Sequence, residues 1–140
     1  MKRTVQKIIT FFVVVLGICC INKIDAKAFT TGDITYINGQ RYLYSNGQKV
    51  INDFVFDGVY TYYAQADGTP MTNRLTYHPD GVHIIYFDKN GHEVFNAFQY
   101  CSSVGYNCYF DSQGYLYKDQ ITYIDGNPYY LNANGALEQN

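Results

Sequence analysis

Apolar and polar positions repeat along most of this chain with a period of about 22 residues. Each unit opens with two large apolar residues spaced two apart, and a constant tyrosine with an apolar residue directly after it comes later. Because residues two apart share one face of a β-strand, the pattern predicts two strands in every unit. The first strands are expected at 34–36, 54–56, 75–77, 98–100 and 121–123.

Turn residues separate the predicted strands. Asn-Gly or Asp-Gly pairs, such as those at 38–39 and 125–126, supply the positive φ angles of tight hairpin turns. A second glycine set at 47, 68, 91, 114 and 135 closes each unit, with the constant tyrosine five residues before each glycine. Each unit is therefore predicted to be one β-hairpin.

One such hairpin is too small to be stable alone, so the units are expected to stack and bury a shared ladder of aromatic rings. We predict an all-β chain, a β-solenoid of about five stacked β-hairpin repeats of ~22 residues, with no helix after residue 28. The alternative is a single β-sandwich whose spacing is coincidental.

The first 28 residues have a different pattern. Basic residues at 2, 3 and 7 precede an apolar run from 8 to 21, and small residues stand at Ala26 and Ala28. The run is short for a membrane span, which needs about 20 residues. We predict a secretory signal peptide at 1–28 that is cleaved after Ala28, a repeat array at 29–140, and a secreted or cell-surface protein.

Composition after residue 28 excludes several function classes. Five basic residues face eleven acidic ones, which gives a net charge of about −6 without a basic cluster. Nucleic acid, and a membrane after signal cleavage, are therefore not expected as partners. All 16 tyrosines lie in this part and the chain has no tryptophan. This indicates much aromatic surface whose hydroxyl groups contact water.

The strings at 86–91, 109–114 and 129–135 resemble the cell-wall-binding repeats of Gram-positive bacteria, a superfamily that includes choline-binding, glucan-binding and clostridial toxin-type short repeats. The resemblance implies a stacked-hairpin fold with ligand sites in the grooves between hairpins, at most four here, and no catalysis. Choline-binding repeats carry tryptophans where this chain has other residues, such as Gln40 and Thr61. The resemblance therefore implies carbohydrate more than choline or teichoic acid.

Sugar recognition needs flat rings for C–H faces and a few polar groups for hydroxyls. Rings of the repeat pattern and extra tyrosines outside it, among them Tyr115, are the candidates, with a role in the ladder as the alternative for each. The candidate ligand-binding residues are Phe56, Tyr62, Tyr63, Tyr77, Tyr86, Tyr100, Tyr106, Tyr109, Tyr117, Tyr123 and Tyr130.

Two cysteines remain after the signal peptide, at the end of one strand and the start of the next. In an exported chain, this pair predicts a cross-strand disulfide between Cys101 and Cys108. Two free thiols are the alternative.

Catalytic chemistry is not indicated. His78 and His83 flank a turn with Asp80 and have the residue types of metal ligands, but exposed turn histidines are the better interpretation. We therefore expect no enzyme, no catalytic residue, no metal and no cofactor.

Two classes of function remain. The first is a non-catalytic module that binds cell-wall or extracellular polysaccharide, and the second is a structural or protein-interaction scaffold. The last unit, with Leu131 and Leu137, is expected to leave an apolar face partly uncovered, which a homodimer through the C-terminal repeat would close.

Overall fold

The computed structural model describes residues 29–138, and within that range it contains strands and turns but no helix. The predicted signal peptide lies outside the described residues. The strands are β1 (Thr30–Thr31), β2 (Asp33–Ile37), β3 (Gln40–Ser45), β4 (Gln48–Lys49), β5 (Asp53–Phe56), β6 (Thr61–Ala64), β7 (Arg74–Tyr77), β8 (Ile84–Phe87), β9 (Ala97–Cys101), β10 (Tyr106–Phe110), β11 (Gln120–Ile124), β12 (Asn127–Leu131) and β13 (Leu137–Glu138). The described residues form no helix with the length and apolarity that a membrane crossing requires.

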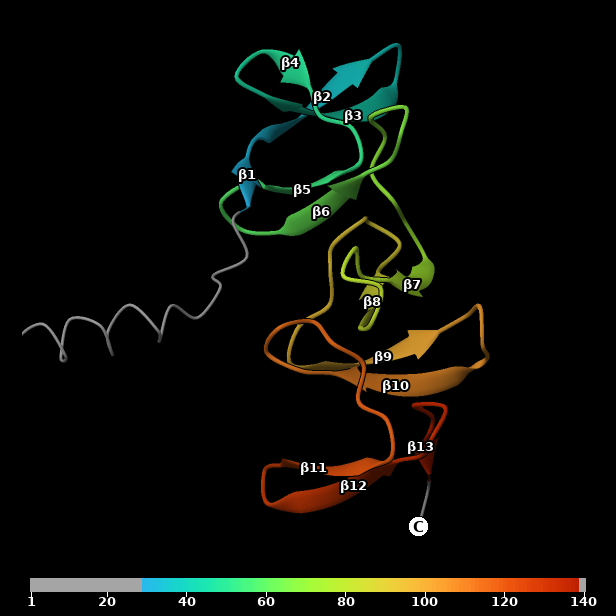
Figure 1. Cartoon of the computed structure of the whole chain (residues 1–140). Helices are drawn as coiled ribbons and strands as arrows, with labels where there is room; N and C mark the ends of the chain where they lie inside the picture. Colours follow the sequence, from blue (N-terminus) through green and yellow to red (C-terminus); the bar gives the residue numbers. More distant parts are fainter. Residues whose placement is uncertain (1–28, 139–140) are drawn as a thin grey trace, which may run out of the picture.

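Five antiparallel hairpins form the body of the chain, and we number them hairpins 1 to 5: β2–β3, β5–β6, β7–β8, β9–β10 and β11–β12. Each belongs to its own small sheet of two or three strands. Figure 1 shows the hairpins following one another along the long direction of the molecule, with their turns pointing to different sides. The prediction of an all-β chain is confirmed.

The tight turns have the backbone geometry that their residues predict. Asn38 and Gly39 have φ angles of 51° and 78°, and Asp125 and Gly126 have φ angles of 50° and 79°. Positive φ at both central residues defines the two-residue turn whose twist matches that of the flanking strands. These turns fix the register of hairpins 1 and 5.

One buried position recurs in every hairpin, directly after the constant tyrosine. The five side chains at this position have no exposed surface: Leu43, Ala64, Phe87, Phe110 and Leu131. Four of the five constant tyrosines are only half-buried, because successive residues of a strand point to opposite faces. Tyr86 is the buried one. The shared ladder therefore consists of these apolar residues, of which only Phe87 and Phe110 are aromatic, so the expected ladder of aromatic rings is present only in part.

The hydrophobic core is divided into small clusters, each built by two neighbouring hairpins. Leu43 packs with Val55 between hairpins 1 and 2, Phe54 with Phe87 between hairpins 2 and 3, and Tyr86 with Phe110 between hairpins 3 and 4. Every hairpin thus depends mainly on its neighbours for burial.

Backbone hydrogen bonds join the same neighbours. The segment after each hairpin returns to the hairpin before it: Leu43 N–H donates to the Gly68 carbonyl at 2.9 Å, Glu93 N–H to Thr61 at 2.8 Å, and Leu116 N–H to Ile84 at 2.8 Å. These bonds hold the turn that follows hairpin 4 against hairpin 3, which positions the site described below.

The C-terminal hairpin is better covered than the sequence predicts. β13 pairs with β12, with Leu137 opposite Leu131, and it also contacts β10. Leu131 has no exposed surface and Leu137 is half-buried. Leu131 therefore adds no apolar surface, and only Leu137 remains partly uncovered. The homodimer through this repeat stays a prediction.

The two cysteines of hairpin 4 are free thiols, so the predicted disulfide is absent. Cys101 pairs with Tyr106 and Cys108 with Gln99, so the cysteines are diagonal neighbours on one face. Diagonal neighbours lie roughly 7–8 Å apart, at the upper limit for bridging. Both side chains are fully buried. The hydrogen bond between the thiols raises the pKa of Cys101, to which burial adds, and lowers the pKa of Cys108.

Candidate functional site

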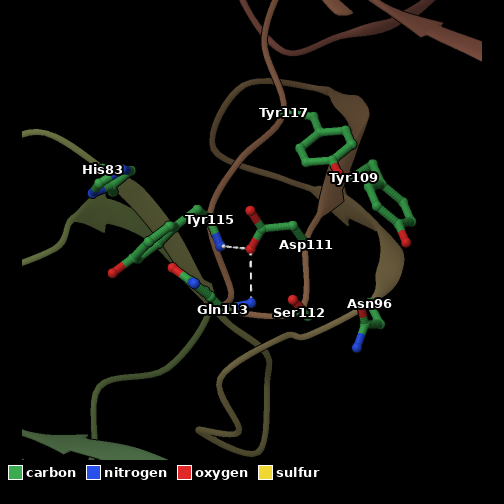
Figure 2. Close-up of a pocket in the computed structure, with 8 residues that line it drawn as sticks. All are labelled: His83, Asn96, Tyr109, Asp111, Ser112, Gln113, Tyr115 and Tyr117. Carbon is green, nitrogen blue, oxygen red and sulfur yellow. Dashed lines mark hydrogen bonds between the residues drawn. The ribbon is translucent and has the colours of Figure 1, made fainter. Parts of the chain in front are cut away.

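A cavity of about 680 Å³ opens where hairpin 4 and the turn after it meet hairpin 3. Figure 2 shows the residues around it, with Tyr109 and Tyr117 on one side of Asp111 and His83 and Tyr115 on the other. The lining residues are His83, Asn96, Tyr109, Asp111, Ser112, Gln113, Tyr115 and Tyr117. The set combines aromatic rings with a carboxylate and two amides.

Asp111 organises the turn that carries the other lining residues. Its Oδ1 accepts hydrogen bonds from the backbone N–H of Gln113 at 2.8 Å and of Tyr115 at 2.9 Å. The Tyr117 N–H then donates to the Tyr109 carbonyl at 2.9 Å. The chain therefore turns back on itself and brings Tyr117 beside the tyrosine of β10.

The two rings on one side of the cavity lie against each other at an angle. The centroids of Tyr109 and Tyr117 are 5.2 Å apart, with 57° between the ring planes. Tyr109 also meets Phe98 edge to face at 5.1 Å. Because both rings are only half-buried, they offer apolar surface to a ligand while their neighbours hold them in place.

The opposite wall is a stack of Tyr115 on His83, with ring centroids 3.8 Å apart and planes within 9°. The Nδ1 atom of His83 lies 2.6 Å from Asp80 Oδ2, and Asp80 Oδ1 accepts the Val82 N–H at 2.8 Å. Asp80 thus fixes the turn of hairpin 3 and the His83 ring with one carboxylate. The fixed His83 ring in turn holds the ring of Tyr115, which belongs to the turn after hairpin 4.

Carboxylates dominate the charge at this wall. Burial raises the pKa of Tyr115, and the negative charges of Asp80, Asp111 and Glu93 raise it further. The hydrogen bond with the His83 side chain, together with backbone N–H donors, lowers the pKa of Asp80 well below its ordinary value despite some opposing desolvation. Both carboxylate and phenol therefore keep their usual charge states at neutral pH.

The hydroxyl groups of the cavity have no described protein partner. Among residues 29–138, no hydrogen bond involves the hydroxyl of Tyr109, Tyr115 or Tyr117. Those of Tyr62, Tyr106 and Tyr130, by contrast, donate to Asp57, the Asn134 carbonyl and Asp119. The cavity can therefore offer hydroxyl, amide and carboxylate groups to a polar ligand.

The equivalent place one repeat earlier has different side chains and contacts. There Tyr86 is 2 % exposed, and Val94 stands where Tyr117 stands in the cavity. The Arg41 guanidinium reaches across from hairpin 1 and donates to the Asn90 carbonyl at 2.7 Å. The ring of His92 is stacked on Tyr60, with centroids 3.6 Å apart.

The equivalent place one repeat later lacks the rings. Ala136 and Glu138 replace Tyr115 and Tyr117, and Asn132 replaces Asp111. The Tyr130 hydroxyl is held by Asp119 at 2.8 Å. The grooves are therefore not equivalent, contrary to the expectation from the repeat, because the residues that form the cavity occur together in one unit only.

The predicted ligand-binding residues separate into three groups. Tyr109 and Tyr117 line the cavity. Six lie within or against the folded chain instead: Phe56, Tyr62, Tyr63, Tyr86, Tyr106 and Tyr130. Tyr62 and Tyr86 are 2 % exposed, so they have little surface for a ligand.

The third group is exposed near the hairpin turns and does not line the cavity. Tyr77, Tyr100 and Tyr123 have 66 %, 55 % and 69 % of their surface exposed, and Tyr36 occupies the same repeat position with 68 %. These side chains project from different hairpins, whose turns point to different sides (Figure 1).

Sequence reasoning missed Asn96 and Gln113, and it treated His83 and Asp111 only as turn residues. The signal that could have found the site is the comparison of repeats position by position. Only one unit has an acidic residue at the turn together with tyrosines four and six residues later, at Asp111, Tyr115 and Tyr117. Among the described residues, no group of three His, Cys, Asp or Glu side chains is placed to hold a metal ion.

Several solved structures share this fold. Alternansucrase in complex with isomaltononaose matches with a TM-score of 0.65 and 26 % identity over 77 % of this chain, but only 9 % of its own. A truncated alternansucrase from Leuconostoc mesenteroides matches with a TM-score of 0.64 and 26 % identity over 76 % of this chain and 10 % of its own. The chain thus spans about a tenth of these enzymes.

Two further structures are less similar in sequence. Choline binding protein F from Streptococcus pneumoniae matches with a TM-score of 0.57 and 22 % identity over 75 % of this chain and 37 % of its own. The Cpl-1 endolysin in complex with a peptidoglycan analogue matches with a TM-score of 0.54 and 20 % identity over 85 % of this chain and 40 % of its own.

No protein-family profile matches the sequence, and no curated protein matches it. The structural matches nevertheless agree with the resemblance that the repeats carry. The choline-binding protein, the endolysin and alternansucrase share this fold, which is consistent with a cell-wall-binding and glucan-binding repeat superfamily.

Proposed function

We propose that this protein is a secreted, non-catalytic repeat module that binds cell-wall or extracellular polysaccharide. In this proposal the hairpins form a solenoid, and a sugar unit occupies the cavity between hairpins 3 and 4. The observation that carries it is the joining of the Tyr109 and Tyr117 rings with Asp111 and Asn96 in one cavity. Rings bind the C–H face of a pyranose, and the polar groups bind its hydroxyls.

The similarity to alternansucrase structures, two of which hold isomalto-oligosaccharides, supports a carbohydrate ligand. A cavity with two exposed rings predicts weak binding for one site, of order millimolar or about −4 kcal/mol. Secretion rests on the predicted signal peptide at 1–28.

Isothermal titration of the purified protein with isomalto-oligosaccharides and with soluble peptidoglycan fragments tests the proposal. We expect Tyr117→Ala to weaken binding of the preferred glycan by at least about tenfold, since one ring contact is lost. Tyr123→Ala is the matched control, because that tyrosine is 69 % exposed and does not line the cavity. Equal affinity of both variants and the wild type would refute the cavity as the site.

A scaffold that binds another protein is the second candidate. The tyrosines exposed near the turns, Tyr36, Tyr77, Tyr100 and Tyr123, favour it, because exposed aromatic residues are typical of protein interfaces. This function predicts that Tyr123→Ala, and not Tyr117→Ala, impairs the interaction. Choline or teichoic acid is a lesser alternative, for which choline is included as a ligand in the titration.

A further inference from the structure

We infer that the cavity selects glycans that carry a free primary ammonium group, such as N-deacetylated hexosamine units, over neutral glucans. The inference rests on the proposed polysaccharide function and names the class of sugar. It is carried by the placement of one carboxylate among the tyrosine rings.

Asp111 is the group that would bind the ammonium. Its Oδ1 is occupied by the two backbone N–H donors of Gln113 and Tyr115. Its Oδ2 has no hydrogen bond or ion pair among the described residues, and Figure 2 shows this oxygen turned away from those donors. A half-buried carboxylate oxygen that lines a cavity is a strong acceptor for a charged donor.

The surroundings do not neutralise this charge. Neither lysine nor arginine lines the cavity, and the one titratable base in the wall, His83, has its Nδ1 directed to Asp80. Asp80 and Glu93 add further negative charge near Tyr115. An ammonium group therefore gains from the local field, while a neutral hydroxyl gains only a single hydrogen bond.

The aromatic rings favour the same group. A cation near the face of tyrosine is attracted by the ring quadrupole, and the attraction grows when the site excludes water. Tyr109 and Tyr117 stand on the same side of Asp111, so an amino group bonded to Oδ2 would lie near these rings (Figure 2). The rest of the pyranose would then contact their apolar surface.

The neighbouring repeats lack this arrangement. One unit earlier, Asp88 Oδ2 faces His92 Nδ1 at 3.6 Å, and Lys89 follows it in sequence. One unit later, the residue is the neutral Asn132. The open carboxylate oxygen is thus a property of hairpin 4 among these three equivalent turns.

A primary ammonium also differs from choline in a testable way. A quaternary ammonium has no N–H and cannot donate to Oδ2, whereas a primary ammonium can donate and forms a charge-assisted hydrogen bond. The chemistry of Asp111 therefore favours an amino sugar over a methylated amine.

The experiment is a titration of the purified protein at pH 6 with four ligands: a glucosamine tetramer, its N-acetylated counterpart, isomaltotetraose and choline. We expect the glucosamine tetramer to bind at least about tenfold more tightly than the other three. Asp111→Asn keeps an oxygen for the two backbone donors but removes the charge, so it should abolish this preference. Asp125→Asn, in the turn of hairpin 5, removes one negative charge elsewhere and should retain it.

Each outcome decides the inference. The amino-sugar inference is overturned if the wild type binds a neutral tetramer or choline at least as tightly as it binds the glucosamine tetramer. If that ligand is a neutral tetramer, the polysaccharide function still stands. Binding of none of the oligosaccharides overturns both. Equal loss of preference in Asp111→Asn and Asp125→Asn would mean that net charge, and not the cavity, attracts the amine. The wild-type selectivity remains decisive if Asp111→Asn does not fold.

Discussion

At the scale of single residues, Asp111 combines a structural role with the proposed binding role in one carboxyl group. One oxygen accepts two backbone N–H groups and shapes the turn, and the other lines the cavity. Asp88 and Asn132 accept equivalent backbone donors in the neighbouring units. The structural role is therefore common to the three units, whereas the proposed binding role depends on the rings that surround Asp111 alone.

The structural role predicts the effect of removing the acceptor. Asp111→Ala leaves the Gln113 and Tyr115 N–H groups without their partner and should lower the free energy of unfolding by about 1–2 kcal/mol. Asp111→Asn retains an acceptor oxygen and should cost much less. Urea unfolding followed by circular dichroism measures both. A similar loss in the two variants would show that the charge, and not the acceptor, stabilises the turn.

Asp80 predicts a specific acid sensitivity. Its hydrogen bond with the His83 side chain holds its pKa below the ordinary value of 3.8. The ionised carboxylate therefore stabilises the folded chain above that value, and the stabilisation is lost as the pH falls through the lowered pKa.

The urea midpoint measured from pH 6 down to pH 2 tests this expectation. The wild-type midpoint should fall more steeply below about pH 4 than that of Asp80→Asn, which cannot lose a charge there. Asp125→Asn serves as a control for the general loss of carboxylate charge. Parallel curves for Asp80→Asn and the wild type would contradict the assigned role of Asp80.

At the scale of the elements, hairpin 4 carries two buried thiols on one face. Cys101 and Cys108 have no exposed surface and pair diagonally rather than directly. We expect both thiols to resist alkylation in the native protein and to react fully, two per chain, after unfolding without a reductant. Mass spectrometry of the alkylated protein gives the count. A chain that stays unlabelled after unfolding would show that the two sulfurs are bonded.

The sequence predicts the hairpins well because their causes are local. Asn38-Gly39 and Asp125-Gly126 impose positive φ, and alternation sets the strands. The core position could not be assigned in the same way. Tyr109 and Phe110 are adjacent aromatic residues on one strand, and the sequence alone does not distinguish their faces. Packing against the neighbouring hairpin decides that Phe110 is the buried one.

The cavity shows the same limit more strongly. The stack of His83 on Tyr115 joins residues 32 positions apart, at two different places in the repeat. Tyr60 and His92 also stack across a separation of 32 positions. This stacking joins two repeat units, so it cannot be recognised from the sequence of one unit. The tyrosine content predicted rings for a ligand, but not which of them the packing of neighbouring hairpins leaves exposed.

At the scale of the whole molecule, stability is distributed over neighbour contacts. The buried clusters each join two adjacent hairpins, and backbone hydrogen bonds connect the same pairs. Such an array has no single centre, and its stability is close to a sum over units and interfaces. Damage to one hairpin should therefore remain local.

Phe110→Ala tests this property. The substitution removes a fully buried ring of hairpin 4 and should cost about 3–5 kcal/mol at that position. Hydrogen exchange should accelerate in hairpins 3 to 5, which contact this position or its neighbours, while hairpin 1 keeps most of its protection. Uniform acceleration over all five hairpins would indicate one cooperative unit instead of an array.

The most direct test of the account is the location of glycan binding on the folded protein. We would titrate isotope-labelled protein with the oligosaccharide that binds best and follow the amide and tyrosine-ring resonances. The account predicts saturation at one ligand per chain, with the largest shifts at Tyr109, Asp111, Tyr115 and Tyr117. Largest shifts at the exposed tyrosines near other turns, such as Tyr36 and Tyr123, or no saturable shift with any oligosaccharide, would contradict it.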